Sequence, residues 1–100
     1  MNIGEVKGSL FFMEGTVYFL QSLKNGAYYI GSTENLGRRI EEHGNGKNKS
    51  TKYLVPWKLV FFKKYPTISE ARNIEYRIKK LKSRKIIERI IQDQDIFLGR

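Results

Sequence analysis

Two strand-like segments on either side of an Asn-Gly pair restrict most strongly how this chain can fold. Residues 16–21, TVYFLQ, and residues 28–31, YYIG, are rich in β-branched and aromatic side chains, and Asn25 and Gly26 lie between them. An Asn-Gly pair favours the tight turns that join antiparallel strands. The sequence therefore predicts a β-hairpin in this part of the chain.

A helix and a third strand are predicted after the hairpin. Ser32 or Thr33 is expected to cap the helix, because both side chains can accept a hydrogen bond from a free backbone N–H. The run KLVFFKKY, residues 58–65, has no internal glycine or proline and is typical of a strand. The helix places four residues on one inward stripe at the i, i+3, i+4, i+7 spacing: Leu36, Arg39, Ile40 and His43.

Two further helices are predicted after the third strand. Thr67 and Glu70 have the spacing of a capping box, so a helix should begin near Ile68. Its inward stripe consists of Ala71, Ile74, Glu75, Ile78 and Leu81. Ser83 is expected to start the last helix, whose apolar side consists of Ile86, Ile87, Ile90 and Ile91. The fold class predicted is α+β, with a three-stranded antiparallel sheet flanked by helices.

A chain of 100 residues is about one small domain, with a single modest core. Residues 1–15 are expected to form a loosely attached lead-in that contains a short apolar patch at 10–13. Residues 16–82 should form the core of the fold, and residues 83–100 a C-terminal helix and tail. There is no internal repeat and no linker to a second domain.

The charge is strongly and unevenly positive. Lys and Arg number 19 against 10 Asp and Glu, a net charge of +9, and the excess lies mostly between Arg38 and Arg89. Such a surface attracts polyanions and favours nucleic acid, DNA above all, as the partner. The alternatives are that the charge only maintains solubility or that it meets acidic lipid. Lipid is less favoured, because no amphipathic helix with bulky apolar anchors is evident.

The sequence shows neither a membrane-spanning or secretion signal nor a cysteine. No apolar run approaches the roughly 20 residues that a bilayer-spanning helix needs, and the first residues do not have the pattern of a secretion signal. We therefore expect a cytoplasmic protein without a membrane partner. Cysteine is absent, so any metal ion must be held by oxygen or nitrogen ligands.

Five polar side chains stand out in the predicted elements: Tyr18 and Tyr29 on the hairpin, Arg39 and His43 on the apolar face of the first helix, and Glu75 within the apolar stripe of the next. Each has an ordinary structural explanation, such as an edge tyrosine, an arginine with a buried stem or a helix-end histidine. Glu75 could form an ion pair with Arg72 or Lys79 on the helix surface, which would contribute little. Burying a lone carboxylate and a lone guanidinium is costly, however, unless they meet partners. Convergence on one phosphodiester-cleaving site is therefore the favoured interpretation.

The segment GNGKNKSTK, residues 44–52, is expected to be a polar loop that does not pack. It contributes three cations, Lys47, Lys49 and Lys52. Two interpretations remain open, a loop that touches the substrate and a solvated connection.

The order and spacing of several short motifs resemble the GIY-YIG nuclease superfamily. The resemblance is to its small stand-alone bacterial branch and to the N-terminal nuclease domain of the excision-repair incision protein. It extends from about residue 16 to residue 82. The motifs that carry it are Thr16-Val17-Tyr18, Tyr29-Ile30-Gly31, the segment from Asn35 to His43, Pro56-Trp57, and the segment from Glu70 to Glu75.

This resemblance implies a metal-dependent endonuclease and a role for each of the five polar residues. Tyr18 would accept the proton of the attacking water, with Tyr29 as its partner. Arg39 would supply positive charge to the phenol and to the phosphoryl oxygens. Glu75 would hold one divalent ion, Mg²⁺ or Mn²⁺, and His43 matches the histidine of some branches of the family. Because an ordinary phenol titrates near pH 10, Tyr18 would need help from a cation or from His43.

The expected substrate-binding residues are Gly31, Ser32 and Arg38, together with the three loop lysines. Gly31, which has no Cβ, would let the substrate backbone or the following helix approach closely. Two departures from the family pattern stand out. Thr16 replaces the glycine of the first triplet, and Ser32 replaces a lysine that often follows the second triplet in the repair branch.

Two rival functions remain open from the sequence. The first is a nucleic-acid-binding module that keeps the fold and the basic face without cutting. The second is a protein-interaction domain that uses the apolar tail Ile96, Phe97 and Leu98, for example as the contact of a homodimer. Since no appended DNA-reading domain is visible, site specificity would come from a partner or be low.

Overall fold

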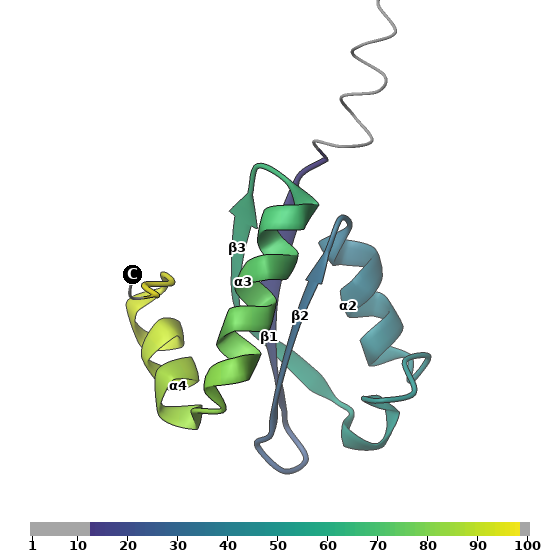
Figure 1. The fold of residues 1–100 in the computed structure, drawn as a ribbon. Coiled ribbons are helices and arrows are strands. Elements are labelled where there is room, and N and C mark those ends of the chain that lie inside the picture. The colour runs from purple at the N-terminus through teal and green to yellow at the C-terminus, as the bar shows by residue number, and fades with distance from the viewer. Residues whose placement is uncertain (1–12, 99–100) are drawn as a thin grey trace, which may run out of the picture.

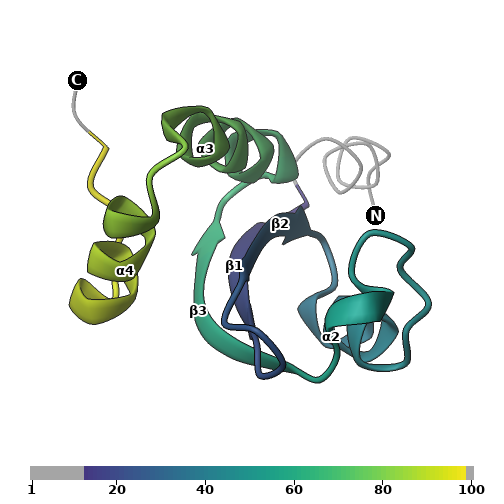
Figure 2. The same cartoon turned by 90° about the horizontal axis from the view of Figure 1, so that it is seen from below.

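A three-stranded antiparallel sheet forms the centre of the computed structural model, which describes residues 13–98. The strands are β1 (Gly15–Ser22), β2 (Tyr28–Thr33) and β3 (Trp57–Tyr65), in the spatial order β2-β1-β3. Figures 1 and 2 show helices α2 and α4 on opposite sides of this sheet. The predicted fold class is therefore confirmed. The lead-in that we expected lies almost entirely outside the described residues.

The hairpin forms where the Asn-Gly pair predicted it. β1 and β2 are joined by a short turn in which Gly26 has φ +79°, a conformation that favours glycine. The turn is closed by a hydrogen bond from the Ser22 N–H to the Ala27 carbonyl, at 2.8 Å. The register that follows places Tyr18 opposite Gly31.

β1 is buried on both faces because it is the central strand. Val17 and Phe19 are fully buried and belong to the hydrophobic core, together with residues of α3 (Ile68–Leu81) and α4 (Arg84–Asp93). Tyr18 points to the opposite face, where it meets a residue of α2 (Leu36–Gly44). The two-residue period of the strand thus separates the face that contributes Val17 and Phe19 to the core from the face on which Tyr18 meets α2.

The helix stripe of α2 is confirmed, but its predicted cap is wrong. His43 is fully buried, and Leu36, Arg39 and Ile40 are partly buried. The cap is Asn35, whose side chain accepts a hydrogen bond from the Arg38 N–H at 3.0 Å. Ser32 and Thr33 are still part of β2, so neither can serve as the cap.

The capping box of α3 is confirmed. The Thr67 side chain accepts a hydrogen bond from the Glu70 N–H at 3.1 Å. The inward stripe is also confirmed at Ala71 and Ile78, which are buried. The prediction is wrong for Leu81, whose side chain is 48 % exposed. This residue lies in the last turn, just before Lys82 adopts a left-handed conformation and ends the helix.

α4 begins after Ser83, as predicted, and the chain after it packs back onto the core. Ile90 and Ile96 are buried in the same cluster as Val17. The tail is also fixed by an ion pair between Lys63 and Asp95, whose Nζ and Oδ1 atoms are 2.5 Å apart. Of the three tail residues considered for a dimer contact, only Phe97 is largely exposed, at 76 %.

Candidate active site

Tyr18, His43 and Thr51 form a row of hydrogen-bonded side chains between the sheet and α2. The Tyr18 hydroxyl lies 3.0 Å from Nε2 of His43, and Nδ1 of the same ring lies 2.8 Å from Oγ1 of Thr51. Each of the three side chains is at most 1 % exposed. The helix stripe predicted from the sequence that His43 faces inward.

Thr51 was not identified from the sequence, and the prediction that residues 44–52 do not pack is wrong at this position. The loop folds back so that the Thr51 side chain reaches His43, just before a short 3-10 helix, η1 (Lys52–Leu54). The Thr51 carbonyl also accepts a hydrogen bond from Nε1 of Trp57, at 3.0 Å. A single threonine in a Lys- and Asn-rich loop gives no periodic signal that could have revealed this contact.

Burial controls the protonation of this row. It raises the pKa of Tyr18 above its ordinary value, and the neighbouring Tyr29 adds to this effect, whereas the Arg39 charge opposes it. Burial also lowers the pKa of His43, reinforced by the Arg39 charge. Both side chains are therefore neutral near pH 7. The positive field that we expected from Arg39 acts in the anticipated direction but is smaller than the effect of burial.

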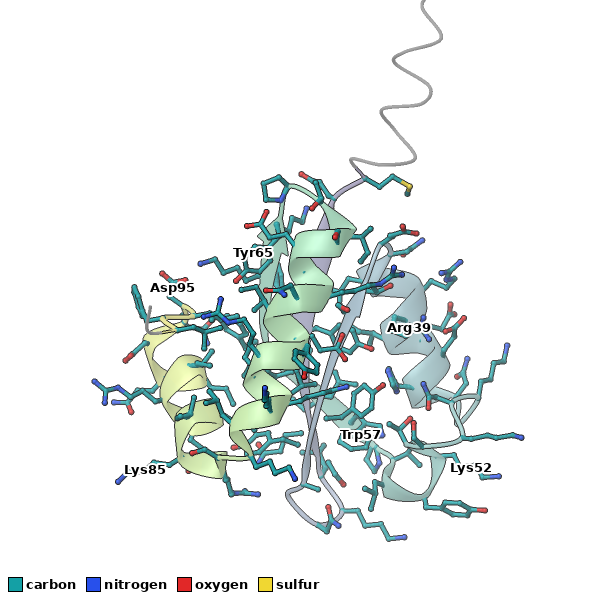
Figure 3. The ribbon with its side chains drawn as sticks, in the orientation of Figure 1. Arg39, Lys52, Trp57, Tyr65, Lys85 and Asp95 are labelled. Carbon is teal, nitrogen blue, oxygen red and sulfur yellow. The ribbon has the colours of Figure 1, made fainter. Side chains whose placement is uncertain are left out.

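Tyr29 completes an aromatic cluster around the histidine. Its ring centre lies 6.2 Å from that of Tyr18, 4.8 Å from that of His43 and 6.3 Å from that of Trp57. Figure 3 shows Trp57 and Arg39 on the α2 side of the molecule, away from Lys85 and Asp95 beside α4. The aromatic rings therefore form one wall of the candidate site.

Gly31 has a steric role that we did not expect from the sequence. A Cβ atom built at this position would lie 2.5 Å from the hydroxyl oxygen and 2.6 Å from Cζ of Tyr18. The group that lies against Gly31 in this structure is therefore the phenol of the opposite strand, and the approach of substrate stays a prediction. The absence of a side chain at Gly31 is what leaves room for the Tyr18 hydroxyl to reach His43.

Replacing Gly31 with alanine is expected to destabilise the fold by about 1–3 kcal/mol, because the added methyl group overpacks a buried, hydrogen-bonded ring. Urea denaturation measures the free energy of unfolding. Gly37→Ala is the matched control: its Cβ would meet only Asn35 Oδ1, at 3.8 Å, and its helical position should make alanine stabilising by about 0.5–1 kcal/mol. Equal effects of the two substitutions would contradict the steric role of Gly31.

Glu75 reaches the site from α3. One carboxylate oxygen accepts a very short hydrogen bond from the Ser32 hydroxyl, and the other pairs with Nζ of Lys79 at 2.5 Å. The Glu75 charge contributes to the raised pKa of Tyr18, and the Lys79 ammonium lies 5.8 Å from the ring centre of Tyr29. The sequence offered Lys79 as a surface partner of Glu75, and this ion pair is present. Ser32 orients Glu75 in this structure, and its contact with substrate stays a prediction.

Arg39 stands beside the phenol with an unused hydrogen-bond donor. Its Nη1 atom lies 3.3 Å from a Glu42 oxygen, whereas its Nε–H is buried and has no partner among residues 13–98. A buried donor without an acceptor typically costs about 1–3 kcal/mol. Such a group at a polar site is explained if the guanidinium turns toward an anionic ligand when one binds.

The predicted basic residues divide into two groups. Lys47 and Lys49 border a small polar pocket together with Arg39, so they stand close to the site. Arg38 is exposed and pairs with Glu42 at 3.8 Å, and Lys52 lies over the Tyr53 ring with Nζ 4.9 Å from its centre. Neither of these two lines that pocket.

The buried His43 side chain should make the free energy of unfolding depend on pH. Because the pKa of His43 is lower in the folded protein, the unfolded chain binds a proton between that lowered value and about pH 6.5, and the folded chain does not. The free energy of unfolding should be fully maintained above about pH 6.5 and should fall as the pH decreases through this window.

Urea denaturation over a pH series measures this effect, with His43→Gln as the comparison. His43 is the single histidine of the sequence, so the variant should lose the acid-side slope in this range. An unchanged slope in His43→Gln would show that other groups cause it.

Within residues 13–98 there is no group of three or more His, Asp or Glu side chains that could hold a metal ion, and no helix of that part is long and apolar enough to cross a bilayer. Of the five predicted catalytic residues, Glu75 is the one that offers a carboxylate to an ion. One carboxylate suits Mg²⁺ in sites where substrate phosphate and water supply the remaining ligands.

Comparisons with known proteins agree with this architecture. Residues 14–88 match the family profile described as the GIY-YIG catalytic domain. A UPF0213 protein of Bacillus licheniformis is 37 % identical over 78 residues, which cover 77 % of this chain and 79 % of the relative. A UPF0213 protein of Clostridium perfringens is 44 % identical over 66 residues, covering 65 % and 70 %.

A solved structure is similar as well. The solution NMR structure of UPF0213 protein BH0048 from Bacillus halodurans shares 37 % sequence identity and has a TM-score of 0.52, covering 80 % of this chain and 84 % of that chain. The family profile spans most of the sequence, including both tyrosines, the α2 arginine and histidine, and the α3 glutamate. The chain therefore belongs to the GIY-YIG domain family.

Proposed function

We propose that this protein is a metal-dependent endonuclease that hydrolyses phosphodiester bonds of DNA. The observation that carries the proposal is the buried Tyr18–His43 hydrogen bond, next to a guanidinium with a free donor and a carboxylate on α3. A phenol, an imidazole, a guanidinium and a carboxylate are groups suited to the hydrolysis of a phosphodiester. Family membership adds the nuclease-type fold.

Tyr18 would accept a proton from the attacking water while its own proton moves to Nε2 of His43. This coupled transfer avoids a free phenolate, which the raised pKa of Tyr18 disfavours. The water oxygen forms a bond to phosphorus as the bond to the leaving oxygen breaks, and solvent returns a proton to that oxygen. His43 then loses its extra proton to water.

Arg39 would turn its guanidinium to the phosphoryl oxygens, which carry the charge that grows in the transition state. Glu75 would hold one Mg²⁺ or Mn²⁺ ion, which supplies Lewis-acid stabilisation of the leaving oxygen when bound. One Glu75 oxygen contacts the Lys79 ammonium in this structure, so a bound ion would have to take the place of that ammonium.

A nicking assay on supercoiled plasmid tests the proposal. Purified protein should convert the plasmid to open circles with Mg²⁺ or Mn²⁺ and should not do so when EDTA removes the ion. Absence of cleavage with every divalent ion tried would contradict the enzymatic function and would leave the binding module as the better account.

DNA binding should depend steeply on salt, because cations at the site replace counterions of the backbone. Each phosphate contact removed should reduce the slope of log K against log [salt] by about one. Lys47→Ala and Lys49→Ala should each reduce it. Lys85→Ala, on the α4 side of the molecule, is the control and should not (Figure 3). Fluorescence anisotropy with a labelled duplex gives the slopes, and a flat salt dependence of the wild type would contradict both nucleic-acid functions.

The protein-interaction function has less support. Ile96 is buried in the core and Leu98 packs against it, so Phe97 is the largely exposed member of the proposed contact. Sedimentation of wild type and Phe97→Ser distinguishes this alternative, since it requires an oligomer that the substitution disrupts.

A further inference from the structure

Each hydrogen bond in the row of Tyr18, His43 and Thr51 needs one donor and one acceptor. Tyr18 is buried, so its single hydroxyl proton must find an acceptor within the protein. The nearby groups are Nε2 of His43, at 3.0 Å, and the hydroxyl of Tyr29. An imidazole nitrogen with a free lone pair is a much stronger acceptor than a phenol oxygen. Donation by the Tyr18 hydroxyl to Nε2 is the direction that uses the stronger of the two acceptors.

That donation fixes the tautomer of the histidine. A neutral imidazole carries one proton, so a ring that accepts at Nε2 must carry its hydrogen on Nδ1. Nδ1 lies 2.8 Å from Oγ1 of Thr51, which can accept this hydrogen. The Thr51 hydroxyl proton in turn faces the Asn48 carbonyl oxygen at 3.5 Å, and a carbonyl can only accept. With these directions every contact in the row is a donor meeting an acceptor.

The backbone of Thr51 is held on several sides, so its hydroxyl is a fixed acceptor. Its N–H donates to the Asn48 carbonyl at 3.1 Å, and its own carbonyl accepts from the indole N–H of Trp57 at 3.0 Å. Its side chain is 1 % exposed, so water does not compete for the imidazole N–H. A threonine held in this way can select one tautomer of its neighbour.

We infer that Thr51 is a positioning residue that holds His43 as the Nδ1–H tautomer, which keeps Nε2 free to take the proton that Tyr18 passes on. The opposite tautomer would place a hydrogen on Nε2 and block this transfer. The catalytic part of the inference rests on the proposed function, whereas the tautomer does not.

Nitrogen NMR of ¹⁵N-labelled protein measures the tautomer directly, and the single histidine of the sequence makes the assignment unambiguous. At neutral pH the wild type should show a protonated Nδ1 and an unprotonated Nε2. Thr51→Val, which keeps the shape and removes the hydroxyl, should shift the ring toward the Nε2–H form. Thr51→Ser should keep the wild-type pattern. A wild-type Nε2–H ring, or an unchanged ring in Thr51→Val, would overturn the inference.

Cleavage kinetics supply the second measurement. Thr51→Val should lower kcat on the order of 10-fold with little change in KM, as is typical when a group that orients a reactive side chain is lost, and Thr51→Ser should restore it. If Thr51→Val does not fold, Thr51→Ala replaces it in both experiments. If the wild type does not cleave at all but shows the expected tautomers, the proposed function fails and the role of Thr51 in fixing the histidine stands.

Discussion

Glu75→Gln is expected to lower the rate of metal-dependent DNA cleavage by about 10³-fold, because Lewis-acid stabilisation is worth several kcal/mol and each 1.4 kcal/mol is a factor of about ten. The substitution removes the charge that would hold the ion. It preserves the shape of the side chain, and the amide oxygen can still accept the hydrogen bond of the Ser32 hydroxyl. The fold should therefore remain intact while the ion is lost.

Glu70→Gln is the matched control, since it makes the same change on an exposed position of the same helix. Single-turnover cleavage with Mn²⁺, together with calorimetric titration of Mn²⁺, measures both the rate and the ion. Cleavage by Glu75→Gln at the wild-type rate would contradict the metal role and would indicate a contaminating nuclease.

Tyr18→Phe is expected to lower cleavage by about 10²- to 10⁴-fold, the range typical for loss of a general acid or base. The ring stays in place beside Gly31, but the oxygen that accepts the proton of the attacking water is missing. DNA binding should change little, because Tyr18 is buried and bears no charge. The loss should therefore appear in kcat rather than in affinity.

The substitution also leaves Nε2 of His43 without its partner, which should destabilise the fold by about 1–3 kcal/mol. Cleavage must accordingly be measured well below the midpoint of thermal unfolding of the variant. Tyr28→Phe, the neighbouring tyrosine of β2, is the control, since its hydroxyl faces Glu88 of α4 at 3.5 Å. If Tyr18→Phe cleaved as fast as this control, Tyr18 could not be the proton acceptor.

Several features of the fold could be predicted from local patterns. The Asn-Gly pair indicated the hairpin, the Thr67–Glu70 capping box indicated the start of α3, and the apolar run of residues 58–65 indicated β3. In these features, residues that are neighbours along the chain determine the backbone conformation. They can therefore be predicted from the sequence alone. The prediction failed at the cap of α2, where the strand continues for two residues more than the sequence indicated.

The site was predictable in its members and less so in their contacts. A histidine and an arginine on a helix stripe, and a glutamate on another, must face inward because of the helical period. Their partners are harder to predict. Thr51 lies in a loop whose composition is typical of solvated segments, and no periodicity marks it. Lys79 is different, because its i, i+4 spacing from Glu75 indicated their ion pair.

The sequence alone determined that this is a basic α+β domain whose hairpin and helices direct two phenols, an imidazole, a guanidinium and a carboxylate toward one another. Only the tertiary structure decided how these groups are used. It showed that Gly31 makes room for a phenol, that Ser32 orients Glu75, and that a loop threonine binds the histidine. The reason is physical: helix and strand periods fix the direction of a side chain, whereas hydrogen-bond partners depend on which distant segments pack together.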